Sequence, residues 1–419
     1  MSVRVTTLAN GMRVASDTMS TVETVSLGAW IETGARDEHA GNNGISHLLE
    51  HMVFKGTERR SARAIAEEIE AVGGHLNAYT SRENTAYYAK VLKDDIGLAV
   101  DLVSDIVMNA TMDSGELERE KSVICQEIHQ AHDTPDDIVF DLLQEAAYPA
   151  QAVGRPVLGT EDIIRAIDRD EICGYRAKGY TAPAVVFSAA GAIDHDHLVD
   201  TIADVFGALP TTARAPREQA LYSGGEMRVD RDLEQAHVLI GLDSVGYKDP
   251  DFYAASVLSA LFGGGMSSRL FQEIREERGL AYSIYSFLSC FEEAGLFGIY
   301  AGTGAEELDE LLPLIAEEAA KVVVDVTPEE TARARAQLKA NMLMARESTS
   351  ARAEQLARQI MVYDRPLPVE EIVAEIEAVD DAAVKAAAAR IFSGAPTLAA
   401  IGPIARLENA ERFAGRFAA

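Results

Sequence analysis

Runs of apolar residues predict the same order of strands and helices twice along the chain. A strand-like run over 22–31 leads through a polar loop to a helix that contains His47, and a second run over 237–242 leads likewise to a helix from about Asp251. Three pairs of glycines keep nearly the same offset of 211–213 residues: Gly28 and Gly241, Gly34 and Gly246, and Gly191 and Gly402. This period is far too long for a solenoid and indicates two copies of one α+β domain.

Each half continues with a strand pair and a long helix whose apolar residues recur at helical spacing. The two apolar stripes are Ile96, Val100, Val103 and Val107 in the first half and Leu308, Leu312, Ile315 and Val322 in the second. Ser114 and Thr327 are N-cap candidates for the helix that follows. A segment with prolines, glycines and little periodicity separates the halves, so we predict domains over 1–210 and 229–419 with a linker over 211–228.

The charge balance excludes some classes of partner. Lys and Arg total 38 against 67 Asp and Glu, which gives a formal net charge of −29. A nucleic-acid-binding protein needs a basic face, and anionic lipid attracts basic segments, so neither partner is expected. The acidic excess suits either solubility alone or the attraction of basic peptides into a negative cleft.

The small number of cysteines and the lack of long apolar runs suggest a cellular compartment. Three scattered cysteines do not form a disulfide framework and fit a reducing compartment. The first residues have no run typical of a signal peptide, and no stretch approaches the ~20 apolar residues of a membrane-spanning helix. We therefore expect a soluble, cytoplasmic protein that does not bind membranes.

The strongest chemical motif is H-x-x-E-H in the segment GISHLLEHMVFKG. His47 and His51 are four residues apart, so on a helix both imidazoles lie on one face and can reach one ion. Glu50 shares that face. This spacing is the inverted form of the zinc-protease signature, and a chance occurrence in a chain of this length is rare. The helix near 251–262 of the second copy contains no histidine, so the chemistry is restricted to the first copy.

A catalytic zinc site needs a third protein ligand. The segment GELEREKSVICQEIHQ places Glu120 and Glu127 seven residues apart on one side of a predicted helix, with Val123 and Ile124 packed into the domain. Glu127 is the best candidate, but the residue pattern alone leaves other donors open: His75, His129 and His132.

The sequence resembles the pitrilysin/insulinase family of zinc metallopeptidases, especially its processing-peptidase β-subunits and bacterial two-domain members. The resemblance covers nearly the whole chain and rests on HLLEHMVFKGT, GGHLNAYTSRENTAYYAKV and LEREKSVICQEI. It implies that His47, His51 and Glu127 bind one Zn²⁺ per chain, that Glu50 is the catalytic base and that Glu120 supports the site. It also implies two homologous α/β-sandwich domains, each a mixed sheet flanked by helices, enclosing a negatively charged chamber.

The resemblance also assigns residues that would contact a peptide substrate. Arg275 and Tyr282 match family residues that reach over the cleft, and Phe54 matches an aromatic position beside the scissile bond. The segment 77–80, with Asn77, Ala78 and Tyr79, resembles the edge strand that pairs with substrate backbone. Asp137 and Asp141, four apart on a helix that Pro135 would begin, match acidic residues that hold a substrate arginine.

We therefore expect a zinc endopeptidase that cleaves extended, basic, arginine-containing peptides or presequence-like segments. It would act as a homodimer or as a heterodimer with a non-catalytic homologue. Two alternatives stay open: a non-catalytic scaffold or assembly subunit of the same fold, and a general oligopeptide-degrading peptidase with the same chemistry. The sequence itself does not separate processing from scavenging.

Overall fold

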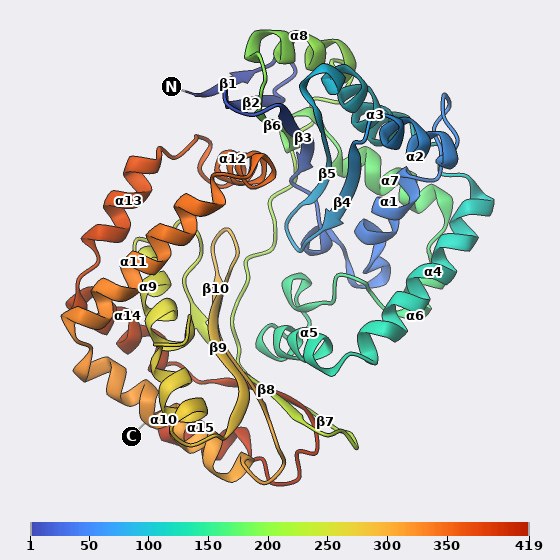
Figure 1. Cartoon of the computed structure of the whole chain (residues 1–419). Helices are drawn as coiled ribbons and strands as arrows, with labels where there is room; N and C mark the ends of the chain where they lie inside the picture. Colours follow the sequence, from blue (N-terminus) through green and yellow to red (C-terminus); the bar gives the residue numbers. More distant parts are fainter. Residues whose placement is uncertain (1, 418–419) are drawn as a thin grey trace. The chain divides into compact units, whose positions relative to one another are not determined.

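Two compact units make up the computed structural model, which describes residues 2–417 (Figure 1). Unit 1 comprises residues 2–129, 155–218 and 344–366, and unit 2 comprises residues 130–154, 219–343 and 367–417. Each unit contains its own β-sheet with helices on both faces, so the predicted pair of α/β sandwiches is confirmed.

The sheets of the two units repeat the same strand order. Unit 1 has six strands in the order β1 (Val3–Thr7), β2 (Arg13–Thr18), β6 (Val185–Gly191), β3 (Thr24–Ile31), β5 (Thr85–Leu92) and β4 (His75–Thr80). Unit 2 has five in the order β7 (Glu226–Asp230), β11 (Thr397–Gly402), β8 (Ala236–Ser244), β10 (Gly295–Thr303) and β9 (Ala281–Cys290). Both sheets are mixed, since β2–β6 and β7–β11 are parallel and the other pairs are antiparallel. The predicted runs over 22–31 and 237–242 are β3 and β8, which occupy equivalent places.

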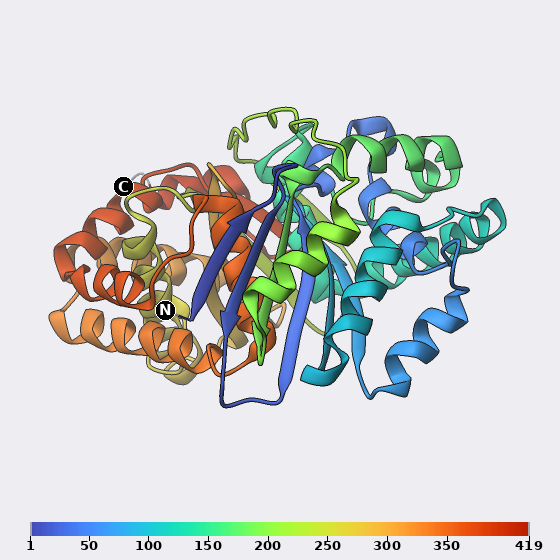
Figure 2. The same ribbon diagram turned by 90° about the horizontal axis from the view of Figure 1, so that it is seen from above.

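One face of each sheet is covered by helices from the same half of the sequence. In unit 1, α3 (Ile96–Asn109) and α8 (His195–Phe206) pack on one face, and Figure 2 shows α8 in green across the strands. In unit 2, α9 (Phe252–Gly263) and α14 (Asp381–Phe392) pack on one face.

The opposite faces are covered by helices exchanged between the halves. Helix α12 (Thr349–Tyr363), from the second half, packs on sheet 1, where Leu356 and Ile360 contact a cluster that includes Trp30. Helix α5 (Pro135–Ala147), from the first half, packs on sheet 2. The compact units therefore do not coincide with the sequence halves, because hydrophobic periodicity shows which face of a helix is buried but not which sheet buries it.

The connection between the halves is anchored rather than free. Arg217 donates to the carboxylate of Asp37 at 2.9 and 2.7 Å, so this end of the predicted linker belongs to unit 1. Strand β7 begins at Glu226, so the last three residues of the segment 211–228 are in a strand.

The remaining helices include those that frame the site described below. Their bounds are α1 (Ile45–Val53), α2 (Ala62–Ala71), α4 (Ser114–His132), α6 (Glu161–Ala166), α7 (Arg169–Gly179), α10 (Leu308–Asp325), α11 (Pro328–Ala345), α13 (Val369–Ala378) and α15 (Ala410–Phe417). Thr327 caps α11 as predicted, by accepting from the Glu330 amide at 3.2 Å. Ser114 is not the cap of α4, because Asp113 accepts from the amides of Gly115 and Glu116.

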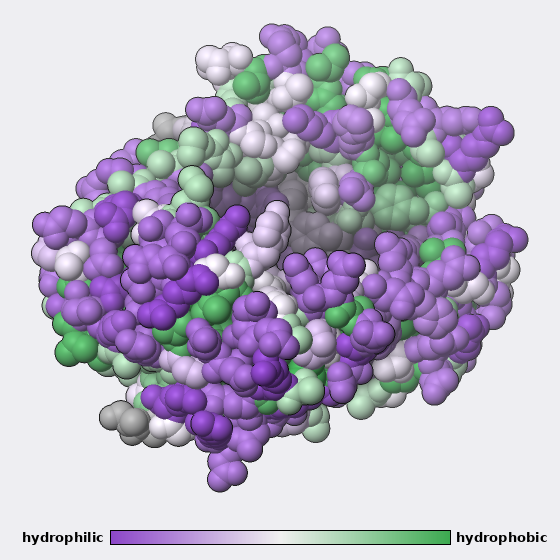
Figure 3. Space-filling view, turned by 60° about the horizontal axis from the view of Figure 1, so that its bottom comes forward, coloured by the Kyte–Doolittle hydropathy of each residue, from purple (hydrophilic) through white to green (hydrophobic). Residues whose placement is uncertain are grey.

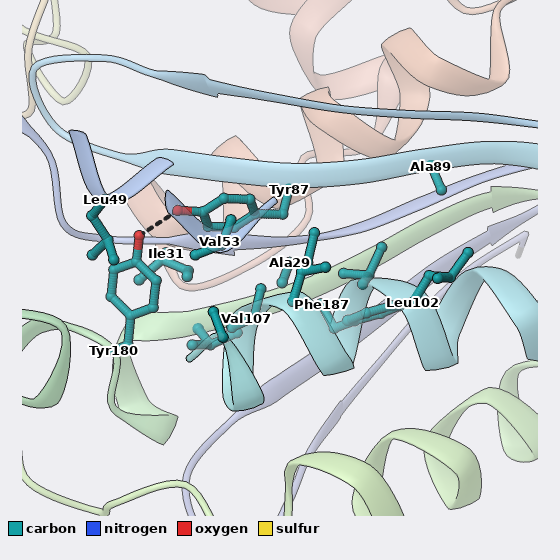
Figure 4. Close-up of a cluster of buried hydrophobic side chains, with 14 of the residues drawn as sticks. Ala29, Ile31, Leu49, Val53, Tyr87, Ala89, Leu102, Val107, Tyr180 and Phe187 are labelled. Carbon is teal, nitrogen blue, oxygen red and sulfur yellow. Dashed lines mark hydrogen bonds between the residues drawn. The ribbon is translucent and has the colours of Figure 1, made fainter. Parts of the chain in front are cut away.

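Hydrophobic packing fixes α1 against sheet 1. Leu49 and Val53 point into a buried cluster with side chains of β5, α3 and β6 (Figure 4). At the edge of this cluster the hydroxyls of Tyr87 and Tyr180 form a hydrogen bond of 2.7 Å. The inner face of α1 is thus part of the core, which leaves its outer face to carry polar chemistry.

Hydrophilic side chains dominate the face of the molecule seen in Figure 3, in keeping with the charge of −29. Within residues 2–417, none of the helices combines the length and apolar character required to cross a bilayer.

Candidate metal centre

Helix α1 presents the H-x-x-E-H motif on one side. Leu48, Leu49 and Met52 are fully buried on the core side, whereas the side chains of His47 and His51 keep 13% and 19% of their exposure. The two imidazole rings lie 4.6 Å apart between centroids, in an edge-to-face arrangement. One turn of helix therefore places both rings beside each other, as their spacing of four residues predicts.

Helix α4 brings the third donor to this pair. Glu127 Oε2 lies 3.7 Å from His47 Nε2 and 3.6 Å from His51 Nε2, and the three donor atoms all lie within 4.8 Å of one another. Ligand atoms at about 2.0–2.2 Å from one tetrahedral ion lie roughly 3.3–3.6 Å apart. The spacing and the two-imidazole, one-carboxylate set therefore fit zinc. In the described part of the chain, no other group of three His, Cys, Asp or Glu donors converges in this way.

The protonation of the histidines agrees with ligation. Burial, and secondarily the neighbouring His51, lowers the pKa of His47 to about 4, so its imidazole is neutral at neutral pH. The Nδ1 atom of His51 lies 3.1 Å from Glu120 Oε2, an acceptor, so Nδ1 carries a proton and Nε2 is the ring nitrogen that faces the donor group. The Nε2 atoms of both rings therefore face the Glu127 carboxylate, where a metal ion would be shared by all three side chains.

Glu120 orients His51 and is itself held in place. Its side chain is 7% exposed, and its second oxygen, Oε1, lies 2.7 Å from Lys55 Nζ. A ligand histidine whose other ring nitrogen donates to a carboxylate has a fixed tautomer and ring orientation. We predict from the sequence that Glu120 supports the site. No pattern in the sequence indicates a role for Lys55, which lies just beyond the end of α1.

Glu50 lies on the same helix as the histidines and is tied to the edge of sheet 1. Thr80, the last residue of β4, donates to Glu50 Oε2 at 2.6 Å. Burial raises the pKa of Glu50, while the hydrogen bond from Thr80 opposes that rise. A carboxylate with a pKa moved towards neutrality suits a general base. The segment 77–80 was predicted as a substrate strand, but the contact between Thr80 and Glu50 was not.

The other predicted ligands have different partners or places. His129 pairs with Glu161 at 3.0 Å, with 62% of its side chain exposed. His75 begins β4, and His132 ends α4. None of the three belongs to the convergent donor group. Val123, predicted to pack inward with Ile124, is 39% exposed, whereas Ile124 is fully buried.

Strand β4 forms a free edge of sheet 1, because within residues 2–417 its only strand neighbour is β5. Next to this edge lies a groove of about 330 Å³, whose lining includes the apolar residues Phe54, Ile65, Ile69 and Leu76 together with Asn77. The Tyr79 hydroxyl accepts from Trp30 Nε1 at 3.2 Å, which fixes the Tyr79 ring to a neighbour within the unit. Phe54, Asn77, Ala78 and Tyr79 are thus grouped around one strand edge.

Four predicted site residues belong to unit 2. The Arg275 guanidinium stacks over the rings of Phe271 and Tyr282, at 4.7 and 5.3 Å from their centroids. Tyr282 is 73% exposed. Asp137 and Asp141 lie one turn apart on α5, which begins at Pro135 as predicted, and burial followed by the charge of Asp141 raises the pKa of Asp137. The predicted site residues are therefore divided between the two units.

Among its described residues, unit 2 has no metal-donor group like that of unit 1. Its α9 contains no histidine, and Asn341 on α11 takes the place that Glu127 has on α4. The groove beside α9 is lined by uncharged residues, and its polar ones are Ser256, Ser259, Gln337 and Asn341. The predicted chemical asymmetry of the two copies is visible in these side chains.

Comparison with known proteins gives a consistent family. The family model described as Insulinase (Peptidase family M16) matches residues 13–161, and the model described as Peptidase M16 inactive domain matches residues 166–338. An uncharacterized zinc protease of Rickettsia bellii is 37% identical over 95% of this chain and 97% of its own length. The probable mitochondrial-processing peptidase subunit beta of Arabidopsis thaliana is 38% identical over 99% of this chain and 81% of its own length. A crystal structure of a peptidase M16 inactive domain from Pseudomonas fluorescens shares the fold, with a TM-score of 0.90, 22% identity and coverage of 97% and 99%.

Proposed function

The chain belongs to the insulinase family of peptidases, family M16, and from that membership we propose that it is a zinc-dependent endopeptidase acting on extended, basic peptides. The observation that carries the proposal is the convergence of His47, His51 and Glu127 beside the half-buried Glu50. A non-catalytic scaffold of the same fold would have no need for this donor set, so the scaffold alternative is not favoured.

In the proposed reaction His47, His51 and Glu127 hold the zinc ion. The bound ion would polarise a water molecule and lower its pKa towards neutrality. Glu50 would act as the general base, accepting a proton from the attacking water and later passing it to the leaving amine. Thr80 holds the Glu50 carboxylate in place, and Glu120 keeps the proton of His51 on Nδ1.

The substrate would bind along β4 as an additional strand. An edge strand offers unpaired backbone N–H and C=O groups, which recognise an extended peptide with little dependence on its side chains. Because Thr80 contacts Glu50, the end of the same strand lies next to the proposed base. We assign the backbone contacts to 77–79 and the apolar groove at Phe54 to a substrate side chain.

Arg275 and Tyr282 are proposed to contact the substrate near the reacting carbonyl. Across the described residues, the Arg275 guanidinium has aromatic partners but no ion-pair partner. Its N–H donors are therefore available to a carbonyl oxygen or a developing oxyanion. We further propose that the chain acts as a dimer, with a second copy or with a non-catalytic homologue.

Chelation tests the zinc requirement directly. Purified chain should contain about one zinc per molecule and cleave unstructured peptides internally. Dialysis against a chelator should abolish cleavage, and one equivalent of Zn²⁺ should restore it, since the ion supplies the activated water. Elemental analysis and mass spectrometry of the products provide the readouts. Undiminished cleavage by zinc-free chain would contradict the proposal, as would the absence of cleavage by zinc-loaded chain.

Arginine preference is expected to depend on α5. We expect the Asp137→Asn/Asp141→Asn double variant to lower the ratio of kcat/KM for an arginine over an alanine peptide by roughly 10- to 100-fold, the ~1.5–3 kcal/mol of hydrogen bonds to charged groups. Because the pKa of Asp137 is raised, acidification should reduce this ratio in the wild type earlier than an ordinary aspartate would. Zinc content should not change. An equal ratio in both proteins would remove this site from the proposal.

A further inference from the structure

We propose that Glu38 is the positioning residue for His47: its buried carboxylate caps the first turn of α1 and so fixes the backbone that carries this zinc ligand. The inference rests on the proposed metal centre and adds to it a residue that touches none of the metal donors.

The first turn of α1 has no cap of its own. A helix leaves its first backbone N–H groups without intrahelical partners, and a side chain at the N-cap position usually accepts from them. Here the N-cap is Gly44, in the left-handed region at φ 96°, which has no side chain to offer. A Cβ at Gly44 would lie 2.6 Å from the carbonyl oxygen of Leu158, so larger residues do not fit there.

Glu38 supplies the missing cap from six residues upstream. Its Oε2 accepts from the Gly44 amide at 2.8 Å, and its Oε1 accepts from the Ser46 amide at 2.9 Å. A negative charge at a helix N-terminus is also favoured by the helix dipole. Both carboxylate oxygens are therefore used to hold the start of α1.

Glu38 is itself held firmly. It is 4% exposed, its Oε2 also accepts from Asn43 Nδ2 at 2.8 Å, and its carbonyl oxygen accepts from Arg155. Asn43 in turn donates to the carbonyl of Pro156 at 3.0 Å. The cap thus joins the loop before α1 to the segment that follows residue 154.

His47 depends on this cap more than His51 does. Helix α1 begins at Ile45, so His47 is its third residue and lies in the capped turn. His47 Nδ1 is buried and makes no hydrogen bond within residues 2–417, so no hydrogen bond at Nδ1 orients this ring. His51 lies one turn further on and is oriented through its Nδ1 by Glu120. Most zinc-ligating histidines have such a partner. For His47, the position of the helix backbone orients the ring in place of such a partner.

The conservative variant should preserve the fold. Burial raises the pKa of Glu38 to about 7, so removing the charge of this side chain costs little stability near neutral pH. Glu38→Gln keeps the shape but replaces one acceptor oxygen by a donor NH₂ group, which cannot accept from a backbone amide.

The experiment compares Glu38→Gln with Asp194→Ala in the full chain. Asp194 caps α8 by accepting from the His197 amide at 2.8 Å, so its loss removes the same kind of contact in the same unit. Both variants should lower Tm by about 2–4 °C. Zinc affinity, measured by competition with a chromogenic chelator well below Tm, should fall by roughly 10- to 100-fold in Glu38→Gln and stay unchanged in Asp194→Ala.

A second readout does not depend on zinc. In metal-free protein, hydrogen exchange at residues 45–48 should be faster in Glu38→Gln than in wild type, with 49–53 unchanged. Zinc affinity within twofold of wild type, or unchanged exchange, would overturn the inference. If Glu38→Gln fails to fold, Glu38→Asp, whose shorter side chain can reach only one of the two amides, replaces it under the same criteria. A wild type that binds no zinc would instead refute the proposed function, while the exchange measurement would still decide the role of Glu38.

Discussion

Glu50→Gln is expected to retain about one zinc per chain and to lose nearly all peptidase activity. Loss of a general base typically costs ~10²–10⁴-fold in rate, about 2.7–5.5 kcal/mol of transition-state stabilisation. A glutamine side chain is isosteric with glutamate and can still accept from Thr80, so the neighbouring helix and the donors are not disturbed. The loss should appear in kcat, with KM little changed, because the carboxylate acts on the attacking water rather than on the peptide.

A surface change of the same kind provides the control. Glu67→Gln removes a carboxylate from α2 whose side chain is 60% exposed and pairs only with Arg63 among the described residues, so its activity should equal that of wild type. Turnover of Glu50→Gln within tenfold of wild type would exclude Glu50 as the base. Loss of zinc from Glu50→Gln would show that this residue supports the metal instead.

The spacing of His47 and His51 was sufficient to predict the part of the site that lies on α1. An imidazole pair four residues apart specifies its own geometry, and the rings of His47 and His51 do lie side by side. The third donor depends on how α4 packs against α1, and residue spacing left Glu127 open against three histidines. Resemblance to the family resolved that choice, and the observed convergence agrees with it.

Contacts that need tertiary packing could not be predicted in this way. Lys55 and Thr80 reach the site from elements whose positions follow from the fold, and neither belongs to a motif. Glu38 acts on α1 across a loop, although a cap normally adjoins its helix. The exchange of α5 and α12 between the halves of the sequence was missed for the same reason, because an amphipathic helix does not specify which sheet it covers.

Glu127→Ala should abolish zinc binding and, with it, activity. Two imidazoles remain in this variant, and a catalytic zinc site uses three protein ligands. Apparent affinity should therefore fall by more than the 10- to 100-fold typical of changes outside the ligand set. Glu127 contributes its oxygen from a side chain that is 37% exposed, so its removal opens little space in the core and the fold should persist. Elemental analysis after gel filtration and chelator competition would measure the loss.

Two other glutamates of helix α4 provide matched comparisons for Glu127→Ala, one with a smaller expected loss of zinc affinity and one with none. Glu120→Ala leaves the three donors in place but frees His51 Nδ1 and the ammonium of Lys55, so zinc affinity should fall by only about 10- to 100-fold. Glu118→Ala changes a carboxylate that is 72% exposed and should leave affinity unchanged. The expected order of zinc affinity is Glu118→Ala, then Glu120→Ala, then Glu127→Ala. If Glu127→Ala bound zinc more tightly than Glu120→Ala, the third ligand would have to be reassigned to Glu120, whose carboxylate already reaches His51 from the opposite side of the ring.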